Sequence, residues 1–105
     1  MDNSHLRGIK NDIIRTIIFD LEGLHAGAPA SYAATLLKQK NPGNDYTVEA
    51  VKGHGQFTAI TTWHDGKKYA VKLPLVTYMA TSLLTEAKRA LYSSRVDRYL
   101  FPMAD

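Results

Sequence analysis

The chain has 105 residues, of which 45% are hydrophobic and 22% are charged, and its formal net charge is +3. This length is enough for one modest hydrophobic core, so we expect a single domain over residues 1–105. The sequence contains no cysteine, which excludes a disulfide framework and thiolate metal sites. It also lacks a secretory signal peptide and any apolar run of about 18 residues, so we expect a cytoplasmic protein without a membrane segment.

The charge is unevenly distributed along the chain. Residues 1–65 carry six basic and seven acidic side chains, whereas residues 66–105 carry seven basic and three acidic ones. A basic C-terminal half is typical of proteins whose partners are rich in phosphate or carboxylate. A solvated surface rich in lysine and arginine explains the same excess, so both interpretations stay open.

A helix is predicted over residues 6–24, where apolar side chains recur at steps of three and four. They are Leu6, Ile9, Ile13, Ile14, Ile17, Ile18, Leu21 and Leu24. Asn3 or Ser4 is suited to cap its start and Gly23 to follow its end. The charged side chains lie largely off this apolar stripe: Arg7, Lys10, Arg15, Asp20 and Glu22. The density of β-branched residues keeps a strand over residues 13–19 open as an alternative.

The stretch "RTIIFDLEGLHAG" at residues 15–27 resembles the nucleophile loop of the haloacid-dehalogenase-like phosphatases. In that family the nucleophilic aspartate follows a buried strand, whose apolar pattern is continuous rather than helical. The second acid is here Glu22, and Leu24 stands where the family has threonine. The family fold also needs a larger sheet with further acidic and lysine motifs. We therefore predict that Asp20 is a carboxylate on the surface of a helix.

A second helix is predicted over residues 29–40, with Pro29 in its first turn and "NPG" at its end. Three strands follow, because the apolar period changes to two. The first is "YTVEAVK" at residues 46–52, and "GHG" at residues 53–55 is a turn. Residues 56–73 form a hairpin around Asp65-Gly66, the favoured pair for a type I′ turn, and Pro74 ends the third strand. The last helix runs from about residue 75 into the mid-nineties and covers the sheet.

The hairpin register predicts the two faces of the sheet. With Asp65 and Gly66 as the loop, Trp63 faces Lys68, and the core face carries Ile60, Tyr69, Val71 and Leu73. The opposite face carries Phe57, Ala59, Thr61, Trp63, Lys68, Ala70 and Lys72. Aromatic side chains stack on bases while cations hold phosphates, so this second face suits nucleic acid. A protein contact, or burial beneath the N-terminal helix as plain core, is an alternative for the same face.

The last predicted helix offers a second basic surface. Lys88, Tyr92, Arg95 and Tyr99 recur along one ridge, flanked by Arg89 and Arg98. Such a ridge is able to contact phosphates. Cations near a helix C-terminus also complement the helix dipole, which is the alternative explanation.

No catalytic or metal-binding pattern is found in the sequence. The four histidines, His5, His25, His54 and His64, are not at the spacings of metal ligands, and no nucleophile motif or phosphate-cradling glycine loop occurs. We therefore expect a protein that is not an enzyme and needs no cofactor.

The stretch from residue 28 to residue 91 resembles the double-stranded-RNA-binding domain in the order of its elements. "PASYAATLLKQK" stands at the first helix of that family, "DYTVEAVKGHGQFTAITTWHDGKKYAV" at its three strands, and "LLTEAKRAL" at the end of its second helix. The resemblance implies an α-β-β-β-α core and RNA binding. "PLVTYMATSL" replaces the family's phosphate-gripping lysine cluster, and His54 only loosely represents its loop histidine. The same order also resembles the ribosome-hibernation factor fold, whose first strand would be the isoleucine-rich segment.

Together these observations predict an α+β fold: a three-stranded antiparallel sheet, a C-terminal helix packed on one face and two N-terminal helices. Residues 1–27 would form the N-terminal helix and loop, and residues 28–105 the α-β-β-β-α core. The leading hypothesis is a non-enzymatic binding module for RNA or a ribonucleoprotein. Its predicted contact residues are Phe57, Trp63, Lys67, Lys68, Lys72, Lys88, Arg89, Arg95 and Arg98. The alternative is a protein-binding adaptor or inhibitor, of the kind phages and mobile elements encode, which occludes a partner's surface. It would act through the aromatic face or the isoleucine stripe, and that stripe could also form a homodimer.

Overall fold

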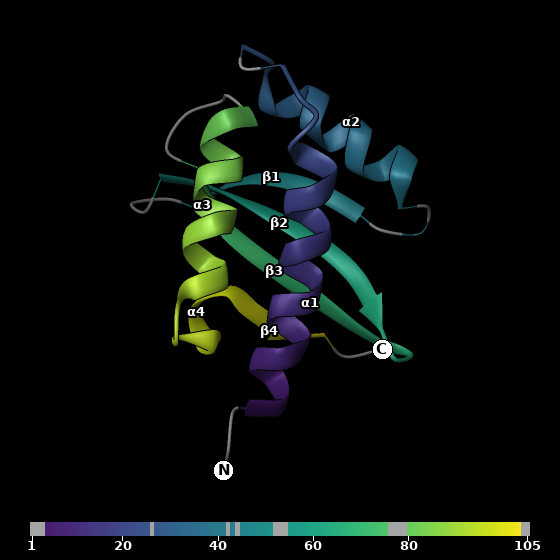
Figure 1. The fold of residues 1–105 in the computed structure, drawn as a ribbon, viewed down its shortest axis with the longest axis vertical. Helices are drawn as coiled ribbons and strands as arrows, with labels where there is room; N and C mark the ends of the chain where they lie inside the picture. The colour runs from purple at the N-terminus through teal and green to yellow at the C-terminus, as the bar shows by residue number, and fades with distance from the viewer. Residues whose placement is uncertain are drawn as a thin grey trace.

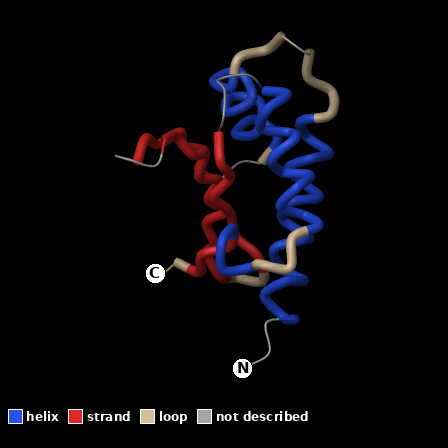
Figure 2. Tube along the Cα trace, turned by 90° about the vertical axis from the view of Figure 1, so that its left-hand side faces the viewer, coloured by secondary structure: helices blue, strands red, loops and turns tan. Residues whose placement is uncertain are grey.

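The computed structural model describes residues 4–25, 27–41, 43, 45–51, 55–75 and 80–103. Its elements are α1 (Ser4–Leu21), α2 (Ala30–Lys40), β1 (Asp45–Val51), β2 (Gly55–His64), β3 (Lys67–Leu75), α3 (Ala80–Tyr92), α4 (Val96–Tyr99) and β4 (Leu100–Pro102). The strands pair antiparallel in the order β1-β2-β3-β4, and the long helices cover one face of the sheet (Figures 1 and 2). The predicted α+β class is confirmed, and β4 is an addition to it.

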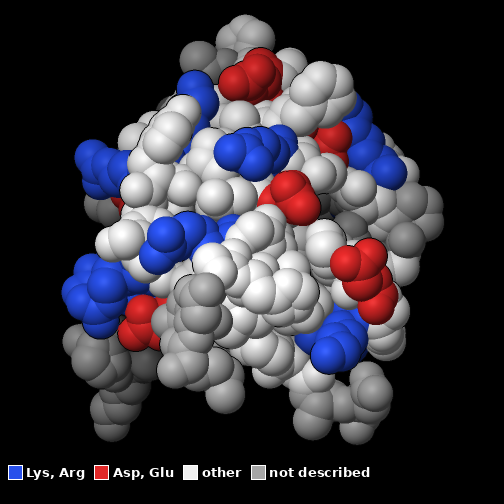
Figure 3. Space-filling view, turned by 60° about the horizontal axis from the view of Figure 1, so that its bottom comes forward, with Lys and Arg blue, Asp and Glu red and all other residues white. Residues whose placement is uncertain are grey.

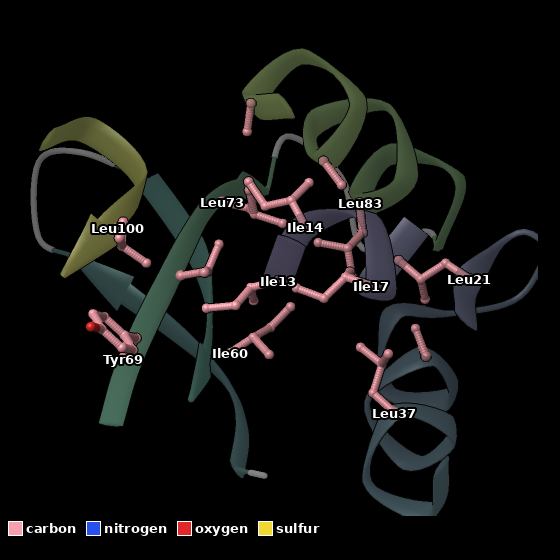
Figure 4. Packing of buried hydrophobic residues seen from close by; sticks show 14 of the residues in the cluster. Ile13, Ile14, Ile17, Leu21, Leu37, Ile60, Tyr69, Leu73, Leu83 and Leu100 are labelled. Atoms are coloured by element: carbon pink, nitrogen blue, oxygen red, sulfur yellow. The ribbon is translucent and has the colours of Figure 1, made fainter. Parts of the chain in front are cut away.

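Helix α1 confirms the helical prediction for the isoleucine-rich segment. It contacts α2 and α3 as well as β2 and β3, so its apolar stripe faces the centre of the molecule. Figure 4 shows Ile13, Ile14 and Ile17 in one cluster with side chains of the sheet and of α3. Ile14 is completely buried. The stripe is therefore core, and the hypothesis that it docks a partner or a second copy of the chain is wrong.

Asp20 lies on a helix, as predicted, but the prediction that it is a surface carboxylate is wrong. Its side chain is 6% exposed, and its Oδ2 accepts a hydrogen bond of 2.7 Å from Nδ2 of Asn41. The backbone N–H of Asn41 donates to Leu37 O at the C-terminus of α2. Asp20 is buried because α2 packs across the end of α1, so this carboxylate joins the two helices.

Lys10 is the second charged side chain whose position differs from the prediction. Helical periodicity places it off the buried stripe, yet it is completely buried. Its ammonium donates hydrogen bonds to Ala90 O at 2.8 Å and to Ser93 O at 2.7 Å. The last carbonyls of a helix have no partner within it and carry its negative dipole end, which explains why a cation from α1 lies at the end of α3.

The hairpin has the predicted register and turn. Trp63 pairs with Lys68, Ile60 with Val71 and Ala59 with Lys72. Asp65 and Gly66 have φ angles of 51° and 78°, as a type I′ turn requires. The side chains predicted for the core face are buried: Ile60, Tyr69, Val71 and Leu73.

Strand β3 runs through Pro74 to Leu75, so the prediction that Pro74 ends it is wrong. Pro74 pairs with Phe57 of β2, whereas β4 pairs only with Tyr69, Ala70 and Val71. The side of β3 that faces away from β2 is therefore unpaired at Pro74. A proline without an N–H donor is tolerated at such an edge position.

The C-terminal segment departs most from the prediction. Helix α3 ends at Tyr92, and Ser93 Oγ accepts a hydrogen bond of 3.1 Å from the N–H of Arg95. The chain then forms the short helix α4 and returns to the sheet as β4, with Val96 and Leu100 buried. The ridge predicted from Lys88 to Tyr99 therefore does not exist, because its residues lie on two helices and the loop between them.

Two predictions fall outside the described part of the chain: most of the "GHG" turn and the segment at residues 76–79 before α3. Among the helices that are described, none combines the length and the apolar character needed to cross a membrane.

Candidate nucleic-acid interface

The sheet face opposite the long helices carries the residues that best fit a binding surface, and we call it the open face. In Figure 2 the helices lie on one side of the sheet and leave its other side uncovered. Strand alternation and register assign to this face Ala59, Thr61, Trp63, Lys68, Ala70, Lys72 and Phe101. Trp63 is 52% exposed. The alternative in which the N-terminal helix covers this face is therefore wrong.

Two aromatic rings and two lysines alternate across the open face. Trp63 of β2 pairs with Lys68 of β3, and the ammonium of Lys72 lies 4.9 Å from the centroid of the Phe101 ring. This distance is within the range of a cation–π interaction, which fixes the lysine beside the ring. From strand spacing and rise, the Cα atoms of Trp63 and Phe101 are about 12 Å apart, on either side of β3.

The residues that lie between the two aromatic rings are small. Ala70 pairs with both Thr61 and Phe101, and Ala59 pairs with Lys72. Ala59 and Ala70 are only 7% and 6% exposed, although no long helix covers this face. These small residues are shielded by the larger side chains around them, which include Trp63 and Phe101.

Phe101 lies on the open face, and the sequence pattern did not reveal this position. The predicted last helix extends into the nineties, which gives "YLFP" no role as a strand. Pro102 indicates a strand here. The residue before a proline is disfavoured in the α conformation and favours an extended conformation. Such a segment is suited to pair with an edge of the sheet.

Phe57 and Lys67 are the remaining hairpin residues that the sequence predicts as contacts, and the outcome differs between them. The backbone of Phe57 lies in β2 and pairs with Glu49 and Pro74, but its side chain is outside the described part, so its role stays a prediction. Lys67 pairs with His64 and follows the alternation of the helix-covered face. It is exposed at the end of the sheet, next to Lys68 but not on the open face.

Most of the other predicted cations already have carboxylate partners. Arg89 lies 3.1 Å from Glu86, Arg95 lies 3.4 Å from Asp97, and Lys88 lies 4.0 Å from Glu22. A hydrogen bond from Arg95, with the charges of Arg95 and Arg98, lowers the pKa of Asp97. Figure 3 shows basic and acidic groups interspersed on the face it presents. These three cations therefore lie beside carboxylates rather than in a purely basic surface.

A groove between α1, α2 and β2 has a mixed lining and a volume of about 240 Å³. Its apolar floor includes Ile17 and Leu37, and its rim includes Asp12 and His64. His64 Nε2 lies 3.6 Å from Asp12 Oδ2, and its Nδ1 lies 3.3 Å from Asp65 Oδ2. The contact with Asp12 joins the hairpin to α1, and the contact with Asp65 lies within the hairpin. Within the ranges that the structure describes, no group of three or more His, Asp or Glu is placed to hold a metal ion.

Comparison with protein-family models, curated proteins and solved structures found no match for this chain.

Proposed function

We propose that the open face binds single-stranded RNA, without catalysis and in the cytoplasm. The observation that carries this proposal is the uncovered sheet face on which Trp63, Lys68, Lys72 and Phe101 alternate. Every base has a face that stacks on an aromatic ring, and lysines beside the rings attract the phosphates that link the bases. Binding would be tolerant of sequence, because neither contact reads the edges of the bases.

A single strand fits this face better than a duplex does. Bases in an A-form duplex are stacked on one another, so their faces are not available to Trp63 or Phe101. Duplex recognition instead relies on shape and on contacts to phosphates and 2′-hydroxyls. Three of the four predicted cations of this segment, Lys88, Arg89 and Arg95, are paired with Glu22, Glu86 and Asp97. RNA therefore stays the proposed partner, with the predicted sheet contacts Trp63, Lys68 and Lys72 kept and those of the last helix left out.

The test is the affinity of the wild-type protein and two alanine variants for a fluorescent single-stranded RNA of about twelve nucleotides, measured by fluorescence anisotropy. We expect Trp63→Ala to weaken binding by about tenfold, since stacking on one aromatic ring contributes about 1–3 kcal/mol per base. Tyr92→Ala is the matched control, because Tyr92 is an aromatic residue that is 86% exposed at the end of α3, away from the sheet. Equal affinities of the wild type and Trp63→Ala, or no RNA binding by the wild type, would overturn the proposal.

A protein-binding adaptor or inhibitor is the second candidate. Two observations favour it: Phe19 is 76% exposed on the helical layer, and three of the predicted cations are engaged in ion pairs. The salt dependence of binding separates the two candidates. RNA binding weakens steeply between about 50 and 200 mM salt because counterions are released from phosphates, whereas a contact centred on aromatic residues changes little.

A further inference from the structure

Residues 93–103 follow α3 and pass from the helical layer back to the sheet, and we call them the return segment. Within it, α4 contacts α1 as well as β3, and β4 pairs with Tyr69, Ala70 and Val71 of β3. Figure 1 shows this passage from the end of α3. The return segment brings Phe101 to the open face, where it pairs with Ala70. One aromatic ring of the proposed RNA-binding surface therefore depends on how this segment is held.

Strand β4 is a short strand at the edge of the sheet. It has three residues, whereas a typical strand has about five to six. Beyond it, Met103 N–H donates one more hydrogen bond, of 2.9 Å, to Lys68 O. Edge elements with few hydrogen bonds open locally at a lower free-energy cost than central strands do. The position of Phe101 therefore also depends on contacts that the return segment makes outside the sheet.

Lys10 of α1 supplies such contacts from the helical layer. Its ammonium donates a hydrogen bond of 2.7 Å to the carbonyl oxygen of Ser93, the first residue of the return segment. The same ammonium lies 5.9 Å from the centroid of the Tyr99 ring, within the range of a cation–π interaction. Tyr99 is the last residue of α4 and directly precedes β4. One buried cation therefore contacts the return segment at its start and again just before β4.

We infer that Lys10 is a positioning residue for the open face, an inference that rests on the proposed function. By holding the return segment against α1, Lys10 keeps Phe101 on the open face, two residues after Tyr99, with its ring 4.9 Å from the ammonium of Lys72. Lys10 itself does not contact RNA, because it is completely buried in the helical layer. Without Lys10, β4 loosens, and the RNA keeps its contact with Trp63 but loses the contact with Phe101.

The experiment is a pair of double-mutant cycles on the affinity for single-stranded RNA, measured by fluorescence anisotropy. We expect Phe101→Ala to weaken binding by about tenfold and Lys10→Met by about three- to tenfold, up to the full effect of losing the Phe101 ring. The double variant of Lys10→Met and Phe101→Ala should bind as Phe101→Ala alone does, because both changes remove the same contact. Combined with Trp63→Ala, the effect of Lys10→Met should instead multiply. Multiplied effects in both cycles, or no effect of Lys10→Met, would overturn the inference.

Two control variants separate positioning from a loss of stability or of charge. Asp20→Asn alters the buried hydrogen bond of 2.7 Å to Nδ2 of Asn41, near the other end of α1 and away from the return segment. Lys40→Met removes an exposed lysine from α2. Both variants should bind RNA as tightly as the wild type does. If either weakens binding as much as Lys10→Met does, lost stability or lost charge explains the effect, and the inference is wrong.

Amide hydrogen exchange tests the positioning without RNA. Lys10→Met should accelerate exchange of the Phe101 and Met103 amides, while the amides of β2 that bond to β3 keep their protection. Unchanged exchange at Phe101 and Met103 would overturn the inference and leave the proposed function intact. If the wild type binds no RNA, the proposed function fails, and the role of Lys10 in RNA binding fails with it.

Discussion

Lys10 and Asp20 show at the scale of single residues how the charged groups of α1 hold the helical layer together. Both side chains are buried, and each binds a group at the C-terminal end of another helix. Helical periodicity places them beside the apolar stripe but gives no information about which element covers that side. Their burial depends on contacts with residues more than 20 positions away, and these could not be predicted from local pattern.

We predict that Lys10→Met destabilises the protein by about 2 kcal/mol. The methionine side chain retains most of the apolar volume but leaves Ala90 O and Ser93 O without their donor, and hydrogen bonds to charged groups contribute about 1.5–3 kcal/mol each. The loss is less than the sum of two such bonds because removing a buried charge recovers part of its desolvation cost. Urea denaturation measures the change, with the exposed Lys40→Met as control. Equal midpoints for Lys10→Met and the wild type would contradict this role.

The same residue gives a prediction about pH. Burial, with a smaller effect from the charge of Arg7, lowers the pKa of Lys10 below its ordinary value of 10.5. Between the two pKa values the unfolded chain binds the Lys10 proton and the folded chain does not, so stability increases with pH in this window. The free energy of unfolding of the wild type minus that of Lys10→Met should therefore increase as the pH approaches 10.5. A difference that stays constant with pH would contradict the lowered pKa.

At the scale of elements, the hairpin was predictable and the C-terminal segment was not. The hairpin follows from local signals, namely alternation over residues 56–73 and an Asp-Gly turn that requires two positive φ angles. The end of α3 has no glycine or proline to mark it, since Ser93 and Ser94 follow Tyr92. The pairing of β4 with β3 connects residues about 30 positions apart. Phe101 could not be predicted for this reason, whereas Trp63 was placed correctly because it lies on the hairpin.

Two glycine variants test the backbone of these elements in opposite directions. Gly8 is exposed in α1, and a Cβ atom added there would have no neighbouring atom within 4 Å, so Gly8→Ala should stabilise the protein by about 0.5–1 kcal/mol. Gly66 has a φ angle of 78°, which L-residues other than Asn and Asp rarely adopt, so Gly66→Ala should destabilise it by about 1–2 kcal/mol. Thermal denaturation of both variants measures the effects. A destabilised Gly8→Ala would contradict the continuous α1 helix, and an unchanged Gly66→Ala would contradict the type I′ turn.

At the scale of the whole molecule, the protein has a covered and an uncovered side. The helical layer buries the isoleucine stripe against one face of the sheet and leaves Trp63 and Phe101 on the other. The sequence was sufficient to predict which residues of the hairpin lie on each sheet face. It left open which face the N-terminal helix covers, because that choice depends on packing between segments far apart in the sequence.

The most direct test of the open face as an RNA-binding surface is a titration of ¹⁵N-labelled protein with single-stranded RNA, followed by amide and indole chemical shifts. We expect the largest shifts at the Trp63 indole N–H and at the backbone amides of Lys68, Ala70, Lys72 and Phe101. Residues of α2 and the exposed face of α3 should not shift. The largest shifts on α3 and α4, or no shift at Trp63 under saturating RNA, would contradict RNA binding by the open face.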